Sequence, residues 1–287
     1  MHDIFYFTDV HGYYSLYKAA LSYCLNEDPE CMIIYGGDAC DRGPDGYKIM
    51  RELLTHPRVV YLKGNHEDMF VRAARFILND YTGPQQLEKI KAYLYSLCIK
   101  DNAASQVQLS IYNGGMSTLT SWMLDGMPND FVSQIDKLPL TFSTDTMDFC
   151  HAGTIPKIFD RVAQDEYNDE FVDQDDIETI LWDRIMLGYG WTPNRICVYG
   201  HTPTPHLPAK YYGSDKSLDS VHPCKYTSDL NTKLSGAKIA MDVGTANSGK
   251  LYVLNCLTLE AIGFKDTDFK DEEIKNHDVE QFEVIQL

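Results

Sequence analysis

The chain has little positive charge: 25 lysine and arginine residues stand against 42 aspartate and glutamate residues, for a formal net charge of −17. This balance works against non-specific docking on nucleic acid or on an anionic membrane, so we expect neither as a partner. No apolar stretch approaches the roughly 20 residues that span a bilayer. The start, Met1-His2-Asp3, lacks the basic region and the small-residue cleavage site of a secretory leader. We therefore expect a cytoplasmic protein.

The cysteines lack the spacing of a metal-binding or disulfide framework. None of the eight forms a C-x-x-C pair, and several, such as Cys150 and Cys197, stand within apolar runs. This distribution argues against a thiolate zinc site and favours buried, reduced thiols. Internal repeats and low-complexity linkers are missing as well. With 44% hydrophobic and 23% charged residues, the composition is that of an ordinary globular protein.

The first third of the chain alternates short apolar runs with amphipathic segments. The apolar runs predict three strands, and apolar residues at helical spacing after each run predict three helices. This order favours parallel strands joined by right-handed crossovers. The expected strands are Ile4–Phe7, Cys31–Tyr35 and Val59–Leu62, and the expected helices are Ser15–Leu25, Asp45–Thr55 and Met69–Leu78.

Residues 83–138 break this rhythm and are expected to form a helical insertion over one edge of the sheet. The expected helical segments are Gln86–Leu97, Ser117–Leu124 and Asp130–Leu138. We expect one domain over residues 1–287 that includes this insertion, because the candidate ligands described below run from Asp9 to His201 and must converge on one site.

Short strands dominate the rest of the chain and suggest a second sheet packed on the first, with helices outside. They are Leu140–Ser143, Met147–His151, Ile196–Tyr199, Lys238–Met241, Leu251–Leu254 and Leu259–Gly263. The acidic segments Asp165–Glu178 and Lys265–Glu283 are expected to be solvated surface, and Tyr212–Gly236 is expected to be a long exposed loop.

Three short motifs carry hard oxygen donors or imidazole on glycine-flanked turns, each directly after an expected strand. They are Thr8-Asp9-Val10-His11-Gly12, Gly37-Asp38-Ala39-Cys40-Asp41-Arg42-Gly43 and Gly64-Asn65-His66-Glu67. The interval from His11 to Asp38 equals that from Asp38 to Asn65. Repeated strand–turn–helix units bring such side chains to one edge of a sheet. That edge can hold two divalent cations, as the hydrolysis of phosphate esters requires.

Two further histidines, His151 and His201, also follow apolar runs and stand beside small turn residues. A single histidine in such a place is more often a hydrogen-bonded structural residue than a ligand. Four of the nine histidines lie at strand-to-turn positions, together with two aspartates and an asparagine, and this makes coincidence improbable.

With these five motifs the chain resembles the phosphoprotein phosphatase family of calcineurin-like metallophosphoesterases, over about Ile4 to Phe264. The family's D-x-H-G, G-D-x-x-D-R-G, G-N-H-E, H-A-G and G-H-T stand here in the same order. One departure is Thr8, where the family has glycine; we expect this position to supply backbone shape only. The resemblance implies an α+β fold, a four-layer α/β/β/α sandwich.

The resemblance also implies the ligands of two metal ions. One ion would be held by Asp9 and His11, and the other by Asn65, His151 and His201, with Asp38 bridging both. Carboxylate and imidazole donors suit manganese, iron or zinc. We expect manganese, with iron or zinc as alternatives.

The family's general acid corresponds to His66, oriented by Asp41; the alternative is that His66 only packs against its turn. Arg42 would bind phosphate oxygens. Of the three arginines between the last two motifs, we choose Arg184 as the second phosphate ligand, because Leu181-Trp182-Asp183-Arg184 resembles the family's tryptophan-containing segment. The alternative for Arg184 is a surface ion pair with Asp183 or Glu178.

The resemblance implies hydrolysis of phosphomonoesters by an activated water, without a phosphoenzyme. At Asp41 and Glu67 the chain resembles the serine/threonine phosphatase branch. The enzymes that split symmetrical dinucleoside polyphosphates commonly lack the aspartate at the position of Asp41, and they carry G-N-H-D where this chain has G-N-H-E. We expect a phosphoprotein or a small phosphorylated molecule as substrate. The alternative is hydrolysis of dinucleoside tetraphosphates, and a non-catalytic scaffold is a third reading. The scaffold is disfavoured because the sequence has the expected residue at every metal-ligand and general-acid position.

Overall fold

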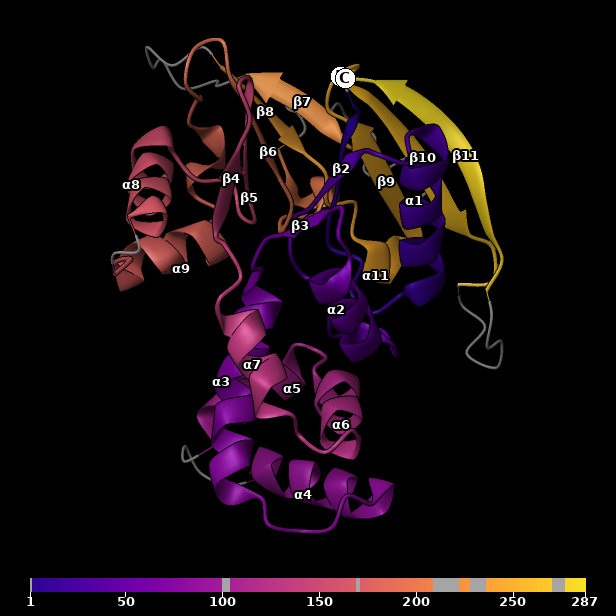
Figure 1. The fold of residues 1–287 in the computed structure, drawn as a ribbon, viewed down its shortest axis with the longest axis vertical. Coiled ribbons are helices and arrows are strands. Elements are labelled where there is room, and N and C mark those ends of the chain that lie inside the picture. Colours follow the sequence, from indigo (N-terminus) through magenta and orange to yellow (C-terminus); the bar gives the residue numbers. More distant parts are fainter. Residues whose placement is uncertain (1, 100–103, 169–170, 209–221, 228–235, 270–276) are drawn as a thin grey trace.

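The computed structural model describes residues 2–99, 104–168, 171–208, 222–227, 236–269 and 277–287 (Figure 1). Two mixed β-sheets face each other within these residues. The first has the strand order β11-β10-β9-β1-β2-β3 and the second β4-β5-β6-β8-β7. The strands are β1 (Ile4–Phe7), β2 (Met32–Tyr35), β3 (Val59–Tyr61), β4 (Thr141–Ser143), β5 (Met147–Cys150), β6 (Ile196–Tyr199), β7 (Cys224–Thr227), β8 (Ala237–Ala240), β9 (Lys250–Asn255), β10 (Glu260–Asp266) and β11 (Val279–Gln286).

Helices cover the outer faces of both sheets (Figure 1). α1 and α2 lie on the first sheet, and α8 and α9 lie on the second. The helices are α1 (Tyr14–Glu27), α2 (Gly46–Thr55), α3 (Asn65–Asp80), α4 (Leu87–Ile99), α5 (Ser105–Tyr112), α6 (Met116–Leu124), α7 (Asn129–Asp136), α8 (Pro156–Tyr167), α9 (Gln174–Trp182) and the short α11 (Thr245–Ser248). The expected four-layer α/β/β/α sandwich is confirmed.

Three buried clusters explain the layers. Tyr6 and Ile34 of the first sheet meet Phe149 and Val198 of the second, and this cluster holds the sheets together. A larger cluster lies between the first sheet and the helices that follow its strands. The third joins the second sheet to α8 and α9. Burial of apolar area contributes about 25 cal/mol for each Å², so these clusters are the main source of stability.

The parallel front half forms as the sequence predicts. β1 pairs with β2 and β2 with β3, both in parallel, with Ile33 opposite Phe5 on one side and Val59 on the other. In the second sheet β5, β6 and β8 are parallel neighbours. Parallel neighbours end at the same edge of a sheet, so the turns that follow them lie together.

The helical segments expected in residues 83–138 are confirmed as α4, α6 and α7. With α3 they form the lower lobe of the molecule in Figure 1. The sequence reading missed α5. Its contacts with α3 and α4 complete the packing of this lobe.

Two surface expectations hold only in part. Part of Tyr212–Gly236 is strand β7, whose alternating buried and exposed residues pair with β8; residues 209–221 and 228–235 lie outside the described part. Within Lys265–Glu283, the described residues are exposed or half-buried as expected, except that Asp266 is buried; β11 pairs along β10, and residues 270–276 lie outside the described part. Both strands lie at a sheet edge, where backbone pairing holds them.

The acidic segment Asp165–Glu178 is solvated only in part. It contains the end of α8 and the start of α9, and residues 169–170 lie outside the described part. Asp176 is buried and receives two hydrogen bonds from Arg161.

The eight cysteines are free thiols, and seven of them are buried, as expected; Cys98 is exposed. Among the described residues no helix combines the length and the hydropathy needed to cross a membrane.

Candidate functional site

The site lies where strands of both sheets end. β1 leads into Asp9 and His11, β2 into Asp38, and β3 into Asn65 at the start of α3. From the facing sheet, His151 follows β5 and His201 follows β6. The structure thus brings the six predicted metal ligands together, and all six are buried, at most 5% exposed.

The backbone at this edge is strained. Among the described residues, nine non-glycine residues have a positive φ, and six of them belong to the predicted site: Asp9, His11, Asp38, Asp41, Arg42 and His201. Such a conformation is uncommon outside glycine and persists only where the surroundings enforce it. The tight turns aim these side chains at a common centre. At Gly200 the approach is so close that a Cβ would lie 2.0 Å from Asp9 Oδ2.

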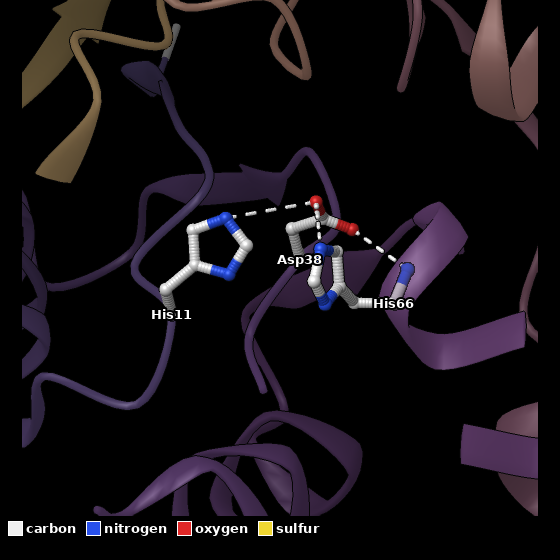
Figure 2. Close-up of side chains that lie close together, drawn as sticks. All are labelled: His11, Asp38 and His66. Atoms are coloured by element: carbon white, nitrogen blue, oxygen red, sulfur yellow. Dashed lines mark hydrogen bonds and ion pairs between the residues drawn. The ribbon is translucent and has the colours of Figure 1, made fainter. Parts of the chain in front are cut away.

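Two groups of possible ligands share Asp38. The first is His11, Asp38 and His66, shown in Figure 2, and the second is Asp38, His151 and His201. Within each group the ligand atoms lie within 4.8 Å of one another. Asp38 Oδ2 is 3.7 Å from His11 Nε2, while Asp38 Oδ1 is 3.3 Å from His151 Nε2. One carboxylate therefore faces both groups, as a bridging ligand would.

Hydrogen bonds fix the imidazole rings. His11 Nδ1 lies 3.0 Å from the carbonyl of Cys40 and His151 Nδ1 lies 2.8 Å from that of Gly36. A ring that donates from Nδ1 turns a free Nε2 lone pair to the opposite side, which is the arrangement found in metal-bound histidines. In both cases Nε2 faces Asp38.

The remaining two ligands adjoin the same centre. Asn65 Oδ1 lies 2.9 Å from His151 Nε2 and 3.0 Å from His201 Nδ1. Asp9 accepts a hydrogen bond from the backbone N–H of His201 at 3.1 Å. Thr8 Oγ1 donates to Asp9 Oδ2 at 2.6 Å, so this residue does more than supply backbone shape.

The electrostatics of the cluster fit divalent cations. Burial and the neighbouring Asp242 raise the pKa of Asp9 well above its usual value. Burial alone would raise the pKa of Asp38 too, but His151 and His66 outweigh it and hold that pKa well below its usual value. Carboxylates this close together without solvent repel one another, and bound divalent cations would relieve that repulsion. Together with imidazole nitrogen they form a donor set suited to manganese, iron or zinc.

His66 is positioned differently from the other histidines. Its Nδ1 lies 2.8 Å from Asp41 Oδ2, and its Nε2 lies 3.8 Å from Asp38 Oδ2 and 3.3 Å from Arg42 Nη2. Burial lowers the pKa of His66, but Asp38 and Asp41 raise it further, so the net pKa is above the usual value. The carboxylates of Asp38 and Asp41 therefore favour the protonated, positively charged form of this ring.

The two predicted phosphate ligands are exposed at the rim of this buried centre. Arg42 approaches His66, and Arg184 Nε lies 3.3 Å from His201 Nε2. The other two candidate arginines are engaged elsewhere: Arg161 binds Asp176 and Arg195 binds Asp148.

Comparison with known protein families matches residues 2–222 to the calcineurin-like phosphoesterases. The chain belongs to this family. Its members normally use two divalent metals, in keeping with the two groups that share Asp38.

One curated relative of this phosphoesterase is the symmetrical bis(5'-nucleosyl)-tetraphosphatase of Buchnera aphidicola subsp. Schizaphis graminum. It is 28% identical over 101 residues, which cover 35% of this chain and 34% of the relative. The match therefore spans about a third of the relative's length.

Solved structures match this chain at low sequence identity and with TM-scores under 0.5. A candidate diadenosine tetraphosphatase matches with a TM-score of 0.44 and 15% identity, over 91% of this chain and 92% of that one. The cold-active protein-tyrosine phosphatase of a Shewanella species matches with a TM-score of 0.43 and 13% identity, over 99% of this chain and 81% of that one. A serine/threonine phosphatase of Saccharomyces cerevisiae matches with a TM-score of 0.41 and 13% identity, over 100% of this chain and 81% of that one. At this distance none of them indicates a substrate.

The sequence reading missed Asp242, a buried carboxylate of the phosphoesterase site. It follows β8, and its Oδ1 accepts a hydrogen bond from the N–H of Gly244 at 2.7 Å. Burial raises the pKa of Asp242 to about 6, and the charge of Asp38 adds to the rise. The signal was available, because Met241-Asp242-Val243-Gly244 repeats the pattern of an aspartate between a strand and a glycine.

Glu67, which the sequence reading used only to separate branches of the family, supports the metal-ligand turns. Its buried carboxylate accepts hydrogen bonds from the N–H groups of Asp38, Ala39 and Gly64 and from the hydroxyl of Tyr61, each at 2.8 Å. It thereby joins the turn after β2 to the turn after β3.

Proposed function

We propose that this phosphoesterase hydrolyses phosphomonoesters as a serine/threonine protein phosphatase of the phosphoprotein phosphatase branch. The observation that carries the proposal is the pair of His66 and Asp41 beside Asp38. Hydrolysis of a seryl or threonyl phosphate expels a poor leaving group, an alkoxide, which needs a proton. A buried imidazole with an anionic partner supplies one.

The chain's own residues divide the work. Asp9, His11 and Asp38 would hold one metal ion, and Asp38 with Asn65, His151 and His201 the other. We infer manganese, with iron or zinc as alternatives. Such ions supply Lewis-acid polarisation of the phosphoryl group and lower the pKa of water toward neutrality.

The remaining site residues act on the substrate. Arg42 and Arg184 orient the phosphoryl oxygens with their planar guanidinium groups. His66 donates its Nε2 proton to the departing oxygen, and Asp41 keeps the ring in the required tautomer and orientation.

A second candidate function is hydrolysis of dinucleoside tetraphosphates. It is favoured by the name of the curated relative from Buchnera aphidicola, a symmetrical bis(5'-nucleosyl)-tetraphosphatase. Asp41 and the G-N-H-E sequence ending in Glu67 favour the protein phosphatase. A scaffold without activity is disfavoured, because none of the predicted ligands is missing.

For partners, we propose a phosphoprotein or small phosphorylated substrate rather than nucleic acid or a membrane, given the net charge of −17. We propose the cytoplasm as the compartment, where free thiols stay reduced.

A parallel assay separates these functions. The manganese-loaded protein is given a phosphoserine peptide and diadenosine tetraphosphate at equal concentrations, and kcat/KM is measured for each. We expect the peptide to be the better substrate; a higher kcat/KM for diadenosine tetraphosphate would replace the first candidate by the second. Release of phosphate from p-nitrophenyl phosphate that is abolished by a chelator excludes the scaffold.

A further inference from the structure

A cavity of about 630 Å³ adjoins the active site on the side of Arg42. It lies where the beginnings of α1 and α2 meet the end of β10, and its lining includes Tyr13, Asp45 and Phe269. Neither the sequence motifs nor the proposed mechanism uses these three residues.

The position of the cavity relates it to the leaving group. Arg42 is part of its lining, and Arg42 Nη2 lies 3.3 Å from His66 Nε2, the atom from which the departing oxygen would take its proton. A phosphorylated residue that places its ester oxygen at His66 would therefore lie beside the wall of this cavity that Arg42 forms.

The cavity contains one carboxylate without a partner. Asp45 precedes α2 and is half-buried, but its side chain does not cap the helix. Within the described part of the chain, no hydrogen bond or ion pair reaches this carboxylate. The other carboxylate of the lining, Asp266, is already bound to His277 at 2.8 Å. The available negative charge of the cavity is thus Asp45.

Aromatic rings line the same cavity as Asp45. The rings of Tyr13 and Phe269 lie 5.1 Å apart between centroids. The neighbouring ring of Tyr14 already has a cation over its face, with Lys48 Nζ at 3.2 Å from the centroid. Aromatic faces beside a carboxylate are the usual surroundings of a bound guanidinium or ammonium group. The net charge of −17 also favours cationic over anionic ligands.

We propose that this cavity binds a basic side chain of the substrate, an arginine or lysine close to the phosphorylated residue, and that Asp45 determines this preference. The proposal rests on the proposed function as a protein phosphatase. Arg42 then divides two subsites, with the phosphoryl group on one side and the basic side chain on the other.

The test uses phosphoserine peptides in which a single arginine is moved through the three positions on either side of the phosphoserine. Each is paired with a peptide that has glutamine in the same place, and kcat/KM is compared within the pair. For the metal-loaded wild-type protein we expect the arginine peptide to be preferred about five- to tenfold at one position or more, and to be equal elsewhere.

Variants then test whether the carboxylate of Asp45 causes the preference for arginine. Asp45→Asn should bring the ratio close to one, and Asp45→Lys should favour a peptide with glutamate at that position. Glu88→Gln, which removes an exposed charge on the distant helix α4, should keep the wild-type ratio.

Two results would overturn the subsite: equal rates for every peptide pair with the wild-type protein, or a preference for arginine that Asp45→Asn leaves intact. If the loaded wild-type protein hydrolyses no phosphoserine peptide, the proposed function itself fails, and the subsite fails with it.

Discussion

His66 donates from Nδ1 to Asp41 Oδ2 over 2.8 Å, and both side chains are buried. This contact joins the turn after β2 to the first turn of α3. It fixes the ring so that Nε2 points toward Asp38 and Arg42, which is where a leaving group would need a proton.

The first prediction follows from this contact. His66→Ala should lower kcat on a phosphoserine peptide by about 10²- to 10⁴-fold, the usual loss when a general acid is removed. Bound metal, measured by elemental analysis, should stay at the wild-type level. Asp41→Asn should lower kcat as well, and the double variant should be no slower than His66→Ala, because the two residues act as a unit. An unchanged kcat of His66→Ala on this peptide would remove His66 from the mechanism.

The two rim arginines give the second prediction. Arg42→Ala and Arg184→Ala should each lower kcat/KM by about 10- to 100-fold, the equivalent of one hydrogen-bonded charge pair. Lysine at either position should restore only part of the rate, because it keeps the charge but loses the planar fork. Arg75→Ala, which removes an exposed arginine paired with Asp136, is the control and should have wild-type kinetics. If Arg184→Ala behaves like that control, Arg184 is not a phosphate ligand.

The third prediction concerns Glu67. In Glu67→Gln an amide N–H₂ replaces an acceptor, so at least one of the three backbone N–H groups is left facing a donor. We expect the free energy of unfolding to fall by about 1–3 kcal/mol. We also expect manganese to bind about 10- to 100-fold more weakly, because the ligand turns lose their common support. Calorimetric titration and denaturant unfolding measure both quantities. Wild-type metal affinity in Glu67→Gln would show that Glu67 does not position the ligands.

The fourth prediction is a pH dependence of stability away from the site. Asp148 in the second sheet accepts hydrogen bonds from Arg195 and from Trp191 Nε1. Burial alone would raise the pKa of Asp148, but these bonds and that from Ser143 lower it below its usual value. A lowered pKa means that the carboxylate stabilises the fold fully above the ordinary aspartate pKa of about 3.9. This contribution is lost as the pH falls through the lower pKa of the folded state.

Asp148→Asn should therefore be destabilised by about 3 kcal/mol at neutral pH. Its deficit relative to the wild type should shrink as the pH falls below about 4. Thermal unfolding between pH 3 and pH 7 tests this, with the exposed Asp145→Asn as control. A deficit that does not change with pH would contradict the role given to the ion pair.

The parts of the fold that side-chain patterns specify were predictable. β1 and β6 form at the expected residues, since both are apolar runs that become buried in a sheet. β11 was missed because it is a polar edge strand, held to β10 by backbone hydrogen bonds that leave little trace in the sequence. α8 was missed because only two of its residues, Phe159 and Val162, are buried.

The ligands of the candidate site were predictable from the sequence, but the residues that support them were not. Its ligands lie in motifs that combine a strand, a turn and a metal-binding residue type, and the structure brings them together. The residues that support these ligands through tertiary contacts cannot be recognised from the local sequence. That Glu67 reaches back to Asp38 and Ala39 depends on how β2 and β3 pair. The proximity of Asp242 to Asp9 depends on how the two sheets face each other.

The number of divalent ions that the buried cluster holds decides whether this chain has a two-metal site. The protein is stripped with a chelator and titrated with manganese, while bound metal and hydrolysis of p-nitrophenyl phosphate are followed together. We expect two ions per chain at saturation, with no hydrolysis by the stripped protein and full hydrolysis once both are bound. Saturation at one ion, or undiminished hydrolysis after stripping, would contradict this expectation.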